Sequence, residues 1–175
     1  MTLRSLRSCF EKGLKVSNDL RTGIGYDAHR LDKKRPLVLG GVKIPHTHGL
    51  AGHSDADVLL HSIADALLGA SGMSDIGTHF SNRDPRWKNV SSLVFLREIA
   101  KIFTKKKIRI VNIDCVLLSE APKIAPYIPR MKSAIAAALK IRAQDVGVKA
   151  STNEGMGFVG RKQGMAATAV ALVRR

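Results

Sequence analysis

The chain has 175 residues, of which 45% are hydrophobic and 25% charged, a composition typical of one globular domain rather than a disordered segment. Its longest apolar-looking run, residues 164–173, is about half the ~20 residues that a membrane-spanning helix needs, so we expect no transmembrane span. The 29 basic residues exceed the 14 acidic ones by 15, which favours nucleic acid, acidic membranes or small phosphorylated molecules as partners without choosing among them.

The two cysteines, Cys9 and Cys115, lack the CxxC spacing of a thiolate metal site or redox pair, which favours a reducing compartment. The N-terminus has no continuous apolar region typical of a secretory signal. Residues 1–21 are basic, with apolar side chains three or four positions apart, as in a short amphipathic helix. A transit peptide, a linker left from a fusion and a plain extension all fit this pattern. We expect a bacterial cytoplasmic protein rather than a plastid one, with an N-terminal extension or linker over residues 1–21 and one domain over residues 22–175.

Strands and helices alternate through that domain. We expect strands over residues 23–31, 36–40, 108–118 and 146–152, and helices over residues 58–69, 91–103 and 131–141. Residues 54–57 are Ser-Asp-Ala-Asp, which suits a helix N-terminus, and three prolines between residues 119 and 129 predict a loop or tight turn. The segment 165–173 fits a helix or a strand. The alternation predicts an α/β or α+β domain with a mainly four-stranded sheet and helices on one face.

Histidines and aspartates concentrate in the first third of the chain. Asp27 and His29 are two apart on an expected strand and therefore face the same side, whereas Asp57, His61 and Asp65 are four apart on an expected helix. Asp27, His29 and His61 would offer two nitrogens and one oxygen with a fourth position open, as in catalytic zinc sites. Asp57 or Asp65 would orient a ligand imidazole from behind. Surface histidines and helix-capping aspartates explain the same spacing, so spacing alone leaves both interpretations open.

Two further clusters lie in the second half of the chain. Lys123 stands between prolines, where it suits either a phosphate contact or an exposed turn. Residues 149–161, KASTNEGMGFVGR, combine phosphate-binding residue types (Thr152 and Arg161) with glycines and with Glu154, a carboxylate suited to a hard divalent cation. A plain glycine-rich hairpin would look the same. Taken together, the clusters indicate metal-assisted phosphoryl chemistry on a small diphosphate.

Longer stretches carry a more specific signal. They are GIGYDAHRL, LGGVKIPHTHGLAGHSDADVLLHSIADALLGA, SDIGTHF, DP, EAPKIAPYIPRM and KASTNEGMGFVGRKQGMAATAVALV, and they run from about Thr22 to Val173. In this order and spacing they resemble the 2-C-methyl-D-erythritol 2,4-cyclodiphosphate synthase family of non-mevalonate isoprenoid biosynthesis. The resemblance implies a phosphorus–oxygen lyase that converts 4-diphosphocytidyl-2-C-methyl-D-erythritol 2-phosphate to the cyclic diphosphate and CMP. It also implies one Zn²⁺ per subunit, Mg²⁺ or Mn²⁺ with the substrate, a homotrimer with active sites between subunits, and an axial cavity able to hold an isoprenoid diphosphate.

The resemblance assigns roles to individual residues of this chain. It implies that the zinc ligands are Asp27, His29 and His61. It implies that the catalytic residues are His53, Thr152 and Glu154, with Glu154 holding the second cation. The substrate contacts that it implies are Ser54, Asp75, Ile76, Gly77, Phe80, Asp84, Ser119, Glu120, Ala121, Pro122, Lys123, Ile124, Ala125, Ser151, Asn153, Phe158 and Arg161.

Two departures from the family pattern affect the substrate loops. Residues 80–85 read FSNRDP where family members often carry FPDTDP, so Asn82 and Arg83 add positive charge, and Glu120 stands where some members have a neutral residue. A zinc-dependent phosphodiesterase is one competing hypothesis and would release an open phosphomonoester. A basic nucleic-acid-binding module is another, against which stand the 5% aromatic content and the lack of a recognisable binding signature.

Overall fold

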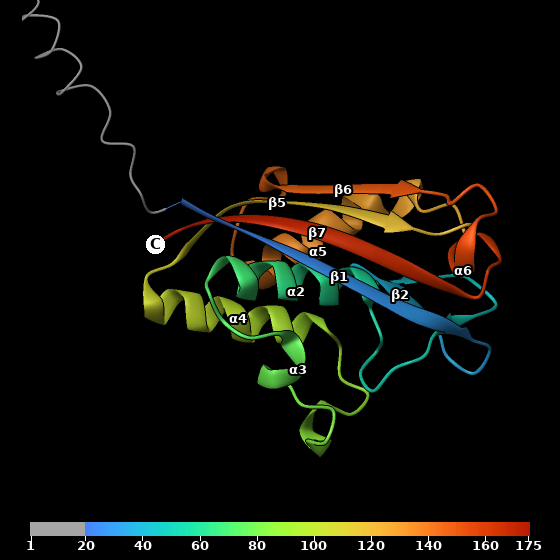
Figure 1. The fold of residues 1–175 in the computed structure, drawn as a ribbon, viewed down its shortest axis with the longest axis horizontal. Coiled ribbons are helices and arrows are strands. Elements are labelled where there is room, and N and C mark those ends of the chain that lie inside the picture. The colour runs from blue at the N-terminus through green and yellow to red at the C-terminus, as the bar shows by residue number, and fades with distance from the viewer. Residues whose placement is uncertain (1–19) are drawn as a thin grey trace, which may run out of the picture.

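A mixed sheet of five strands forms one layer of the protein in the computed structural model, which describes residues 20–175 (Figure 1). The strand order is β4-β1-β7-β5-β6. The strands are β1 (Leu20–Asp32), β4 (Gly49–Leu50), β5 (Arg109–Leu118), β6 (Val146–Ser151) and β7 (Gly164–Arg174). The pairs β1–β7 and β5–β7 are antiparallel, whereas β5 and β6 are parallel. A separate hairpin joins β2 (Leu37–Leu39) to β3 (Val42–Ile44).

Three longer helices, α2 (Val58–Ala70), α4 (Leu93–Lys106) and α5 (Ile128–Leu139), cover one face of the sheet (Figure 1). Two single-turn helices, α3 (Ile76–His79) and α6 (Gly157–Gly160), lie in loops, together with 3₁₀ turns at Pro85–Trp87, Ala125–Tyr127 and Ala143–Asp145. Within residues 20–175, no helix combines the length and the apolar character that crossing a membrane would require. The predicted extension falls mainly on residues 1–19, which lie outside the described residues.

Most of the expected elements are present, and the differences have local physical reasons. The ambiguous segment forms strand β7 at the centre of the sheet, where its alanines leave room for a helix packed on top. The predicted loop over residues 119–129 is wrong at its end, because Pro129 lies in the first turn of α5, where a helix does not use the amide hydrogen that proline lacks. The fifth strand, β4, has two residues, too few to show the alternation of a strand.

Two glycines in β1 bring α2 unusually close to the sheet. A Cβ on Gly25 would lie 2.0 Å from the backbone oxygen of Ser62, and one on Gly23 would lie 2.2 Å from that of Ala66. Helix α2 therefore rests on the backbone of β1 instead of on intervening side chains. This contact places His61, the residue before Ser62, directly over the strand that carries Asp27 and His29.

The opposite face of the sheet carries no helix, and on it β1 and β7 expose apolar side chains, whereas β5 and β6 carry the Asp114–Lys149 ion pair. Ile24, Tyr26 and Val170 are 71%, 57% and 46% exposed, while the alternate residues of β7 are buried against the helices. Large exposed apolar patches on soluble proteins mark interaction surfaces. The single chain therefore presents a sheet face that is suited to covering by another chain.

Candidate active site

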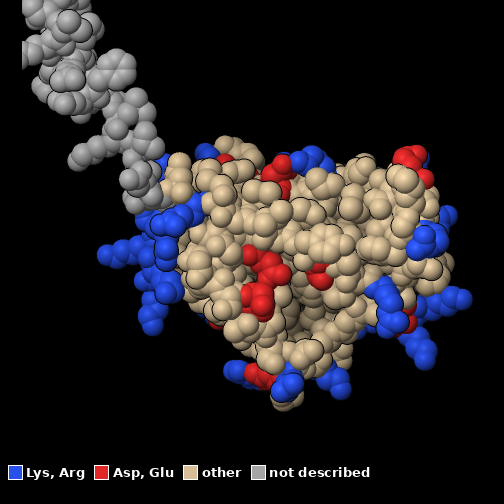
Figure 2. Space-filling model, viewed as in Figure 1, with Lys and Arg blue, Asp and Glu red and all other residues tan. Residues whose placement is uncertain are grey.

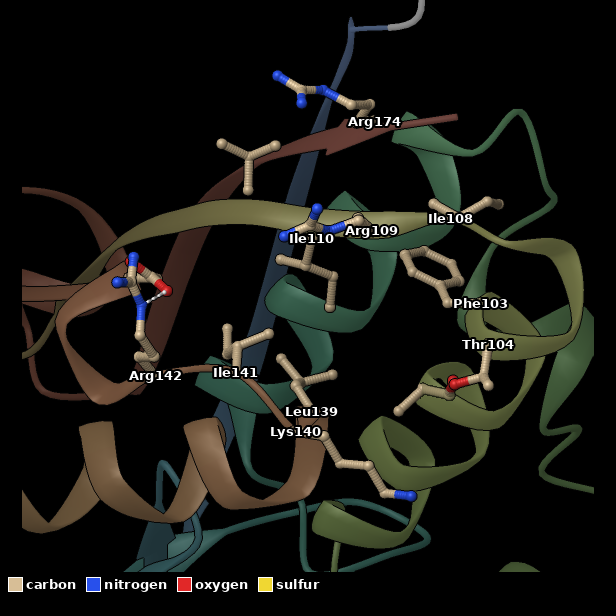
Figure 3. A pocket seen from close by; sticks show the side chains of 13 residues that line it. Phe103, Thr104, Ile108, Arg109, Ile110, Leu139, Lys140, Ile141, Arg142 and Arg174 are labelled. Atoms are coloured by element: carbon tan, nitrogen blue, oxygen red, sulfur yellow. Dashed lines mark hydrogen bonds and ion pairs between the residues drawn. The ribbon is translucent and has the colours of Figure 1, made fainter.

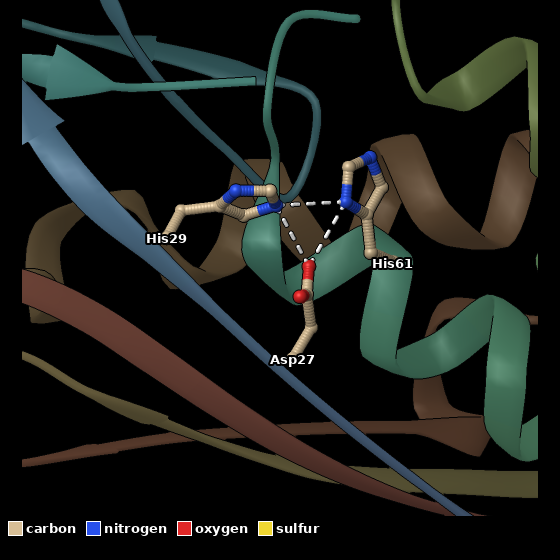
Figure 4. Close-up of side chains that lie close together, drawn as sticks. All are labelled: Asp27, His29 and His61. Carbon is tan, nitrogen blue, oxygen red and sulfur yellow. Dashed lines mark hydrogen bonds and ion pairs between the residues drawn. The ribbon is translucent and has the colours of Figure 1, made fainter. Parts of the chain in front are cut away.

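Asp27, His29 and His61 meet at the C-terminal half of β1, as their spacing predicts (Figure 4). Asp27 Oδ2 lies 2.8 Å from His29 Nε2 and 2.9 Å from His61 Nδ1. The two ring nitrogens are 3.1 Å apart. All three side chains are half-buried, and one ligand atom from each lies within 4.8 Å of the others.

The electrostatics of the three groups are coupled. Burial alone would raise the pKa of Asp27, but hydrogen bonds with His29 and His61 outweigh it and hold that pKa well below its usual range. Burial would lower the pKa of His29, but the contact with Asp27 outweighs it and raises that pKa. Two imidazole nitrogens and one carboxylate oxygen form a donor set that suits a zinc ion with a fourth position open. The three residues therefore fit the metal that the resemblance implies.

Among the described residues, Asp57 and Asp65 form hydrogen bonds with backbone amides and none with either ring, so the role of one of them in orienting an imidazole stays a prediction. Asp57 is fully buried and caps α2: Oδ1 accepts from the amides of Gly40 (2.9 Å) and Leu60 (3.1 Å), and Oδ2 accepts from the amide of Gly41 (2.7 Å). Burial, with the nearby carboxylate of Asp55, raises the pKa of Asp57 to about 7.

Asp65 acts on α3. Its Oδ1 accepts from the amide of Ile76 over 2.7 Å, which fixes the start of the Asp75-Ile76-Gly77 turn beside α2. Asp75 itself caps that turn by accepting from Thr78. Helical spacing places Asp65 on the same side of the helix as His61, but only the folded structure shows that its carboxylate accepts a hydrogen bond from the Ile76 backbone amide.

A cavity of about 400 Å³ opens beside the triad. His29, His53, Ser54 and His61 line one side of it. His53 Nε2 is the one buried side-chain nitrogen or oxygen of residues 20–175 that lacks a hydrogen-bond partner. A buried polar atom without a partner is costly, so a ligand in the cavity would satisfy it.

An aromatic group closes the other side of this cavity. Phe80, Trp87 and Phe95 pack with ring centroids 4.8–5.8 Å apart, and Ile76 and Gly77 complete the wall. Trp87 and Phe95 were not predicted from the sequence, because nothing local distinguishes them from core residues. Asn82 also lines the cavity, so one of the residues in which the FSNRDP loop departs from the family pattern reaches it.

The carboxylate of Asp84 forms an ion pair with Arg86. Both of its oxygens accept from the Arg86 guanidinium at 2.6–3.1 Å, and Oδ1 also caps the turn that begins at Pro85. Its predicted substrate contact stays a prediction.

The other predicted residues gather where β5 and β6 end. Since these strands are parallel, their C-terminal ends share one edge of the sheet, and the loops that follow lie together. Ser119 donates its amide to the Ser151 carbonyl (3.0 Å), and Glu120 Oε1 accepts from the amide of Asn153 (2.8 Å). Thr152 Oγ1 donates to Glu154 Oε1 over 2.5 Å on the exposed surface.

The predicted site thus falls into two parts within one chain. We call the cavity-lining residues around Asp27, His29, His53 and His61 the triad half, and residues 119–125 with 151–154 the loop half. Ser119, Glu120 and Ala121 line a different cavity of about 260 Å³, together with Val159 and Lys162 of the α6 region, and the two cavities share no residue. Phe158 (38% exposed) and the exposed Arg161 lie in this region, outside the triad cavity.

A further cavity, of about 660 Å³, is a poor candidate for the chemistry. It lies among the C-terminal ends of α4 and α5 and the start of β5 (Figure 3). Its lining has no histidine, and its one carboxylate, Asp145, accepts from Arg142 at 2.8 and 2.9 Å.

On the face seen in Figure 2, acidic side chains gather beside a hollow, while lysines and arginines stand at the edges. On this face, the lysines and arginines therefore lie away from the hollow.

The fold and the triad define a mixed α/β domain with a metal-binding group. The family model described as the YgbB family matches residues 20–174, and the chain belongs to this family. Among curated relatives, the 2-C-methyl-D-erythritol 2,4-cyclodiphosphate synthase of Syntrophomonas wolfei is 51% identical over 156 residues, covering 89% of this chain and 99% of its own. That of Desulfatibacillum aliphaticivorans is 55% identical over 152 residues, covering 87% and 98%.

Solved structures agree with this placement. The bifunctional IspDF of Campylobacter jejuni matches with a TM-score of 0.81 and 38% identity over 89% of this chain and 42% of its own. A CDP complex of IspF from Plasmodium falciparum matches with a TM-score of 0.78 and 36% identity, covering 90% of this chain and 97% of that one.

Proposed function

We propose that this chain converts 4-diphosphocytidyl-2-C-methyl-D-erythritol 2-phosphate to 2-C-methyl-D-erythritol 2,4-cyclodiphosphate and CMP. The observation that carries the proposal is the convergence of Asp27, His29 and His61 beside a cavity, in a chain of the YgbB family. Relatives at 51% and 55% identity bear the name of this synthase. The catalytic domain would be residues 22–175.

The reaction needs no protein nucleophile. An oxygen of the substrate's 2-phosphate attacks the β-phosphorus, and the bond from that phosphorus to the bridging oxygen breaks, so CMP leaves with the electron pair. The work of the chain is then positioning and charge neutralisation. His53, whose Nε2 is buried without a partner, and the Thr152 hydroxyl would hydrogen-bond the phosphate oxygens. A zinc ion on the triad would act as a Lewis acid on the diphosphate.

A second cation, Mg²⁺ or Mn²⁺, would bind at Glu154. This carboxylate is exposed, and its one hydrogen bond among the described residues comes from Thr152. Hard cations of this kind take carboxylate and phosphate oxygens and keep several waters. Glu154 lies outside the compact metal-binding group, which supports two separate metal roles.

The decisive experiment is incubation with the substrate, with and without a chelator, followed by phosphorus NMR. We expect the cyclic diphosphate and CMP, both abolished by the chelator and restored by zinc with magnesium. A phosphodiesterase would instead release an open phosphomonoester. Absence of the cyclic product from metal-loaded protein would refute the proposal.

The active sites would lie between subunits of a homotrimer. Two observations support this arrangement: the helix-free sheet face exposes Ile24, Tyr26 and Val170, and the triad half and loop half line separate cavities in one chain. The triad half of one subunit would face the loop half of its neighbour, whose residues 119–125 would hold the cytosine.

Subunit mixing tests the shared site. Asp27→Asn damages the triad half and Lys123→Ala the loop half, so mixed trimers would contain some interfaces in which both halves are intact. We expect activity to reappear after subunit exchange. Tyr26→Asp, placed on the exposed sheet face, should dissociate the assembly in sedimentation experiments. Monomeric wild-type protein with full activity would contradict the shared site but leave the reaction itself intact.

A further inference from the structure

The ring nitrogen of His61 that faces away from Asp27 is held by a buried hydroxyl. His61 Nε2 lies 2.9 Å from Ser92 Oγ, and Ser92 is 0% exposed. Ser54 Oγ is a second, more distant oxygen on the same side, at 3.2 Å. Ser92 stands just before α4, 31 positions from His61, so the contact forms only in the folded chain.

The hydroxyl hydrogen of Ser92 is already committed. Ser92 Oγ donates to Asp55 Oδ1 over 2.5 Å, and Asp55 Oδ2 accepts from the Ser92 amide over 3.0 Å. A hydroxyl has one hydrogen and two lone pairs. Because the carboxylate takes the hydrogen, Ser92 presents a lone pair to His61, and this contact is a good hydrogen bond only when Nε2 carries the ring proton.

The other side of the ring favours the opposite tautomer. Asp27 Oδ2 lies 2.9 Å from Nδ1 and would attract a proton there. A neutral imidazole has one N–H, so Asp27 and the Ser92–Asp55 pair compete for its position. A metal bound at Nδ1 needs the lone pair of that nitrogen, and therefore needs the proton on Nε2.

We propose that Ser92 and Asp55 are positioning residues for His61, which hold its proton on Nε2 and leave Nδ1 free for the metal. The inference rests on the metal site of the proposed function and assigns to this pair the task that the sequence had suggested for Asp57 or Asp65. Hydrogen-bond partners behind a ligand imidazole fix its tautomer and orientation, and their loss typically lowers metal affinity about 10–100-fold.

The segments that carry Asp55 and Ser92 are also joined by hydrogen bonds to the loop that carries His53. The Asp55 amide donates to the Val90 carbonyl (3.0 Å), and the Asn89 amide donates to the His53 carbonyl (2.9 Å). The guanidinium of Arg35 donates to the carbonyls of Gly52 and Ser54. The loop that carries His53 and the segment that carries Ser92 are therefore fastened together, so a disturbed Ser92 would also move His53.

The test compares Ser92→Ala with wild type and with Ser62→Ala in the full chain. Ser62 is also 0% exposed and lies next to His61, but its hydroxyl donates to the Leu59 carbonyl (2.9 Å), so it controls for loss of a buried hydroxyl. Zinc affinity is measured by chelator competition, and the tautomer of His61 by ring ¹⁵N shifts of the metal-free protein at alkaline pH, where imidazole is neutral.

We expect Ser92→Ala to weaken zinc binding about 10–100-fold and to shift the metal-free ring toward the Nδ1–H tautomer. Ser62→Ala should do neither, and Ser92→Thr, which keeps the hydroxyl, should restore both values. Should Ser92→Ala not fold, Asp55→Asn decides: it keeps the Ser92 hydroxyl, but one of the two side-chain oxygens that accept from the hydroxyl and the amide of Ser92 becomes a nitrogen that cannot accept. Folded variants with wild-type zinc affinity and tautomer would overturn the inference, whereas wild-type protein that fails to bind zinc would instead overturn the proposed metal site.

Discussion

Replacing Gly25 by alanine should disturb stability and metal binding together. The added Cβ would lie 2.0 Å from the Ser62 carbonyl oxygen and 2.7 Å from the Ala66 amide nitrogen, whereas real Cβ atoms essentially never approach within 3.0 Å. Both obstacles are backbone atoms of α2, so a side-chain rotation cannot relieve the clash. To bring the 2.0 Å contact up to 3.0 Å, the helix must move away from β1 by about 1 Å. Such a substitution overpacks the interior.

The expected cost follows from that displacement. Overpacking of this kind costs about 1–3 kcal/mol, which for a chain of this size corresponds to a fall in Tm of roughly 2–12 °C. His61 moves with α2 while Asp27 and His29 stay on β1, and a metal site tolerates about 0.2 Å. We therefore expect loss of zinc affinity beyond what the change in stability explains.

Gly69→Ala is the matched control, because Gly69 also lies on α2 but its added Cβ would come no closer than 3.9 Å, to the Ile24 carbonyl oxygen. This variant should be stabilised by up to about 1 kcal/mol, because glycine is a poor helix former. Thermal unfolding at one protein concentration and zinc titration measure both variants. A Gly25→Ala protein with the Tm and zinc affinity of wild type would refute the close packing of α2 on β1.

Three further predictions concern single side chains. Asp65→Ala should raise KM several-fold at unchanged zinc content, since it frees the Ile76 amide and one hydrogen bond contributes about 1 kcal/mol; Asp65→Asn, which keeps the acceptor oxygen, should stay near wild type, and zinc loss in Asp65→Ala would contradict this role. Glu154→Gln should keep zinc and lose turnover, partly recovered by high magnesium; unchanged turnover and magnesium dependence would exclude Glu154 as a cation ligand. Burial, with the Asp114 carboxylate, raises the pKa of Cys115 to about 12, so its thiolate fraction grows only at strongly alkaline pH. At about pH 8, peptide mass spectrometry should therefore find Cys115 unalkylated by iodoacetamide until denaturant is added. Rapid alkylation of the native protein would show that Cys115 is not buried.

Local sequence spacing predicted which side chains of the candidate site share a face, but it left the metal-site interpretation open. Asp27 and His29 face one side because strand residues alternate, and His61 lies on a helix whose apolar positions recur at helical period. The glycine-rich and proline-rich segments were correctly placed after strands, because these residues end regular structure. The resemblance rests on such local stretches and led to the family that the comparisons show.

Contacts between distant segments could not be read in this way. Ser92 and Asp55 are 37 positions apart, and the sequence indicates only that each lies near the start of a helix, yet they meet beside His61. Asp57 and Asp65 have the helical spacing expected of residues that orient a ligand imidazole. In the structure, however, their carboxylates accept hydrogen bonds from the backbone amides of Gly40, Gly41 and Ile76. Spacing along a helix or strand specifies only which side chains share a face. Which buried hydrogen-bond donor a carboxylate finally meets depends on how the separate elements pack, because each buried polar group must find a partner in the assembled interior.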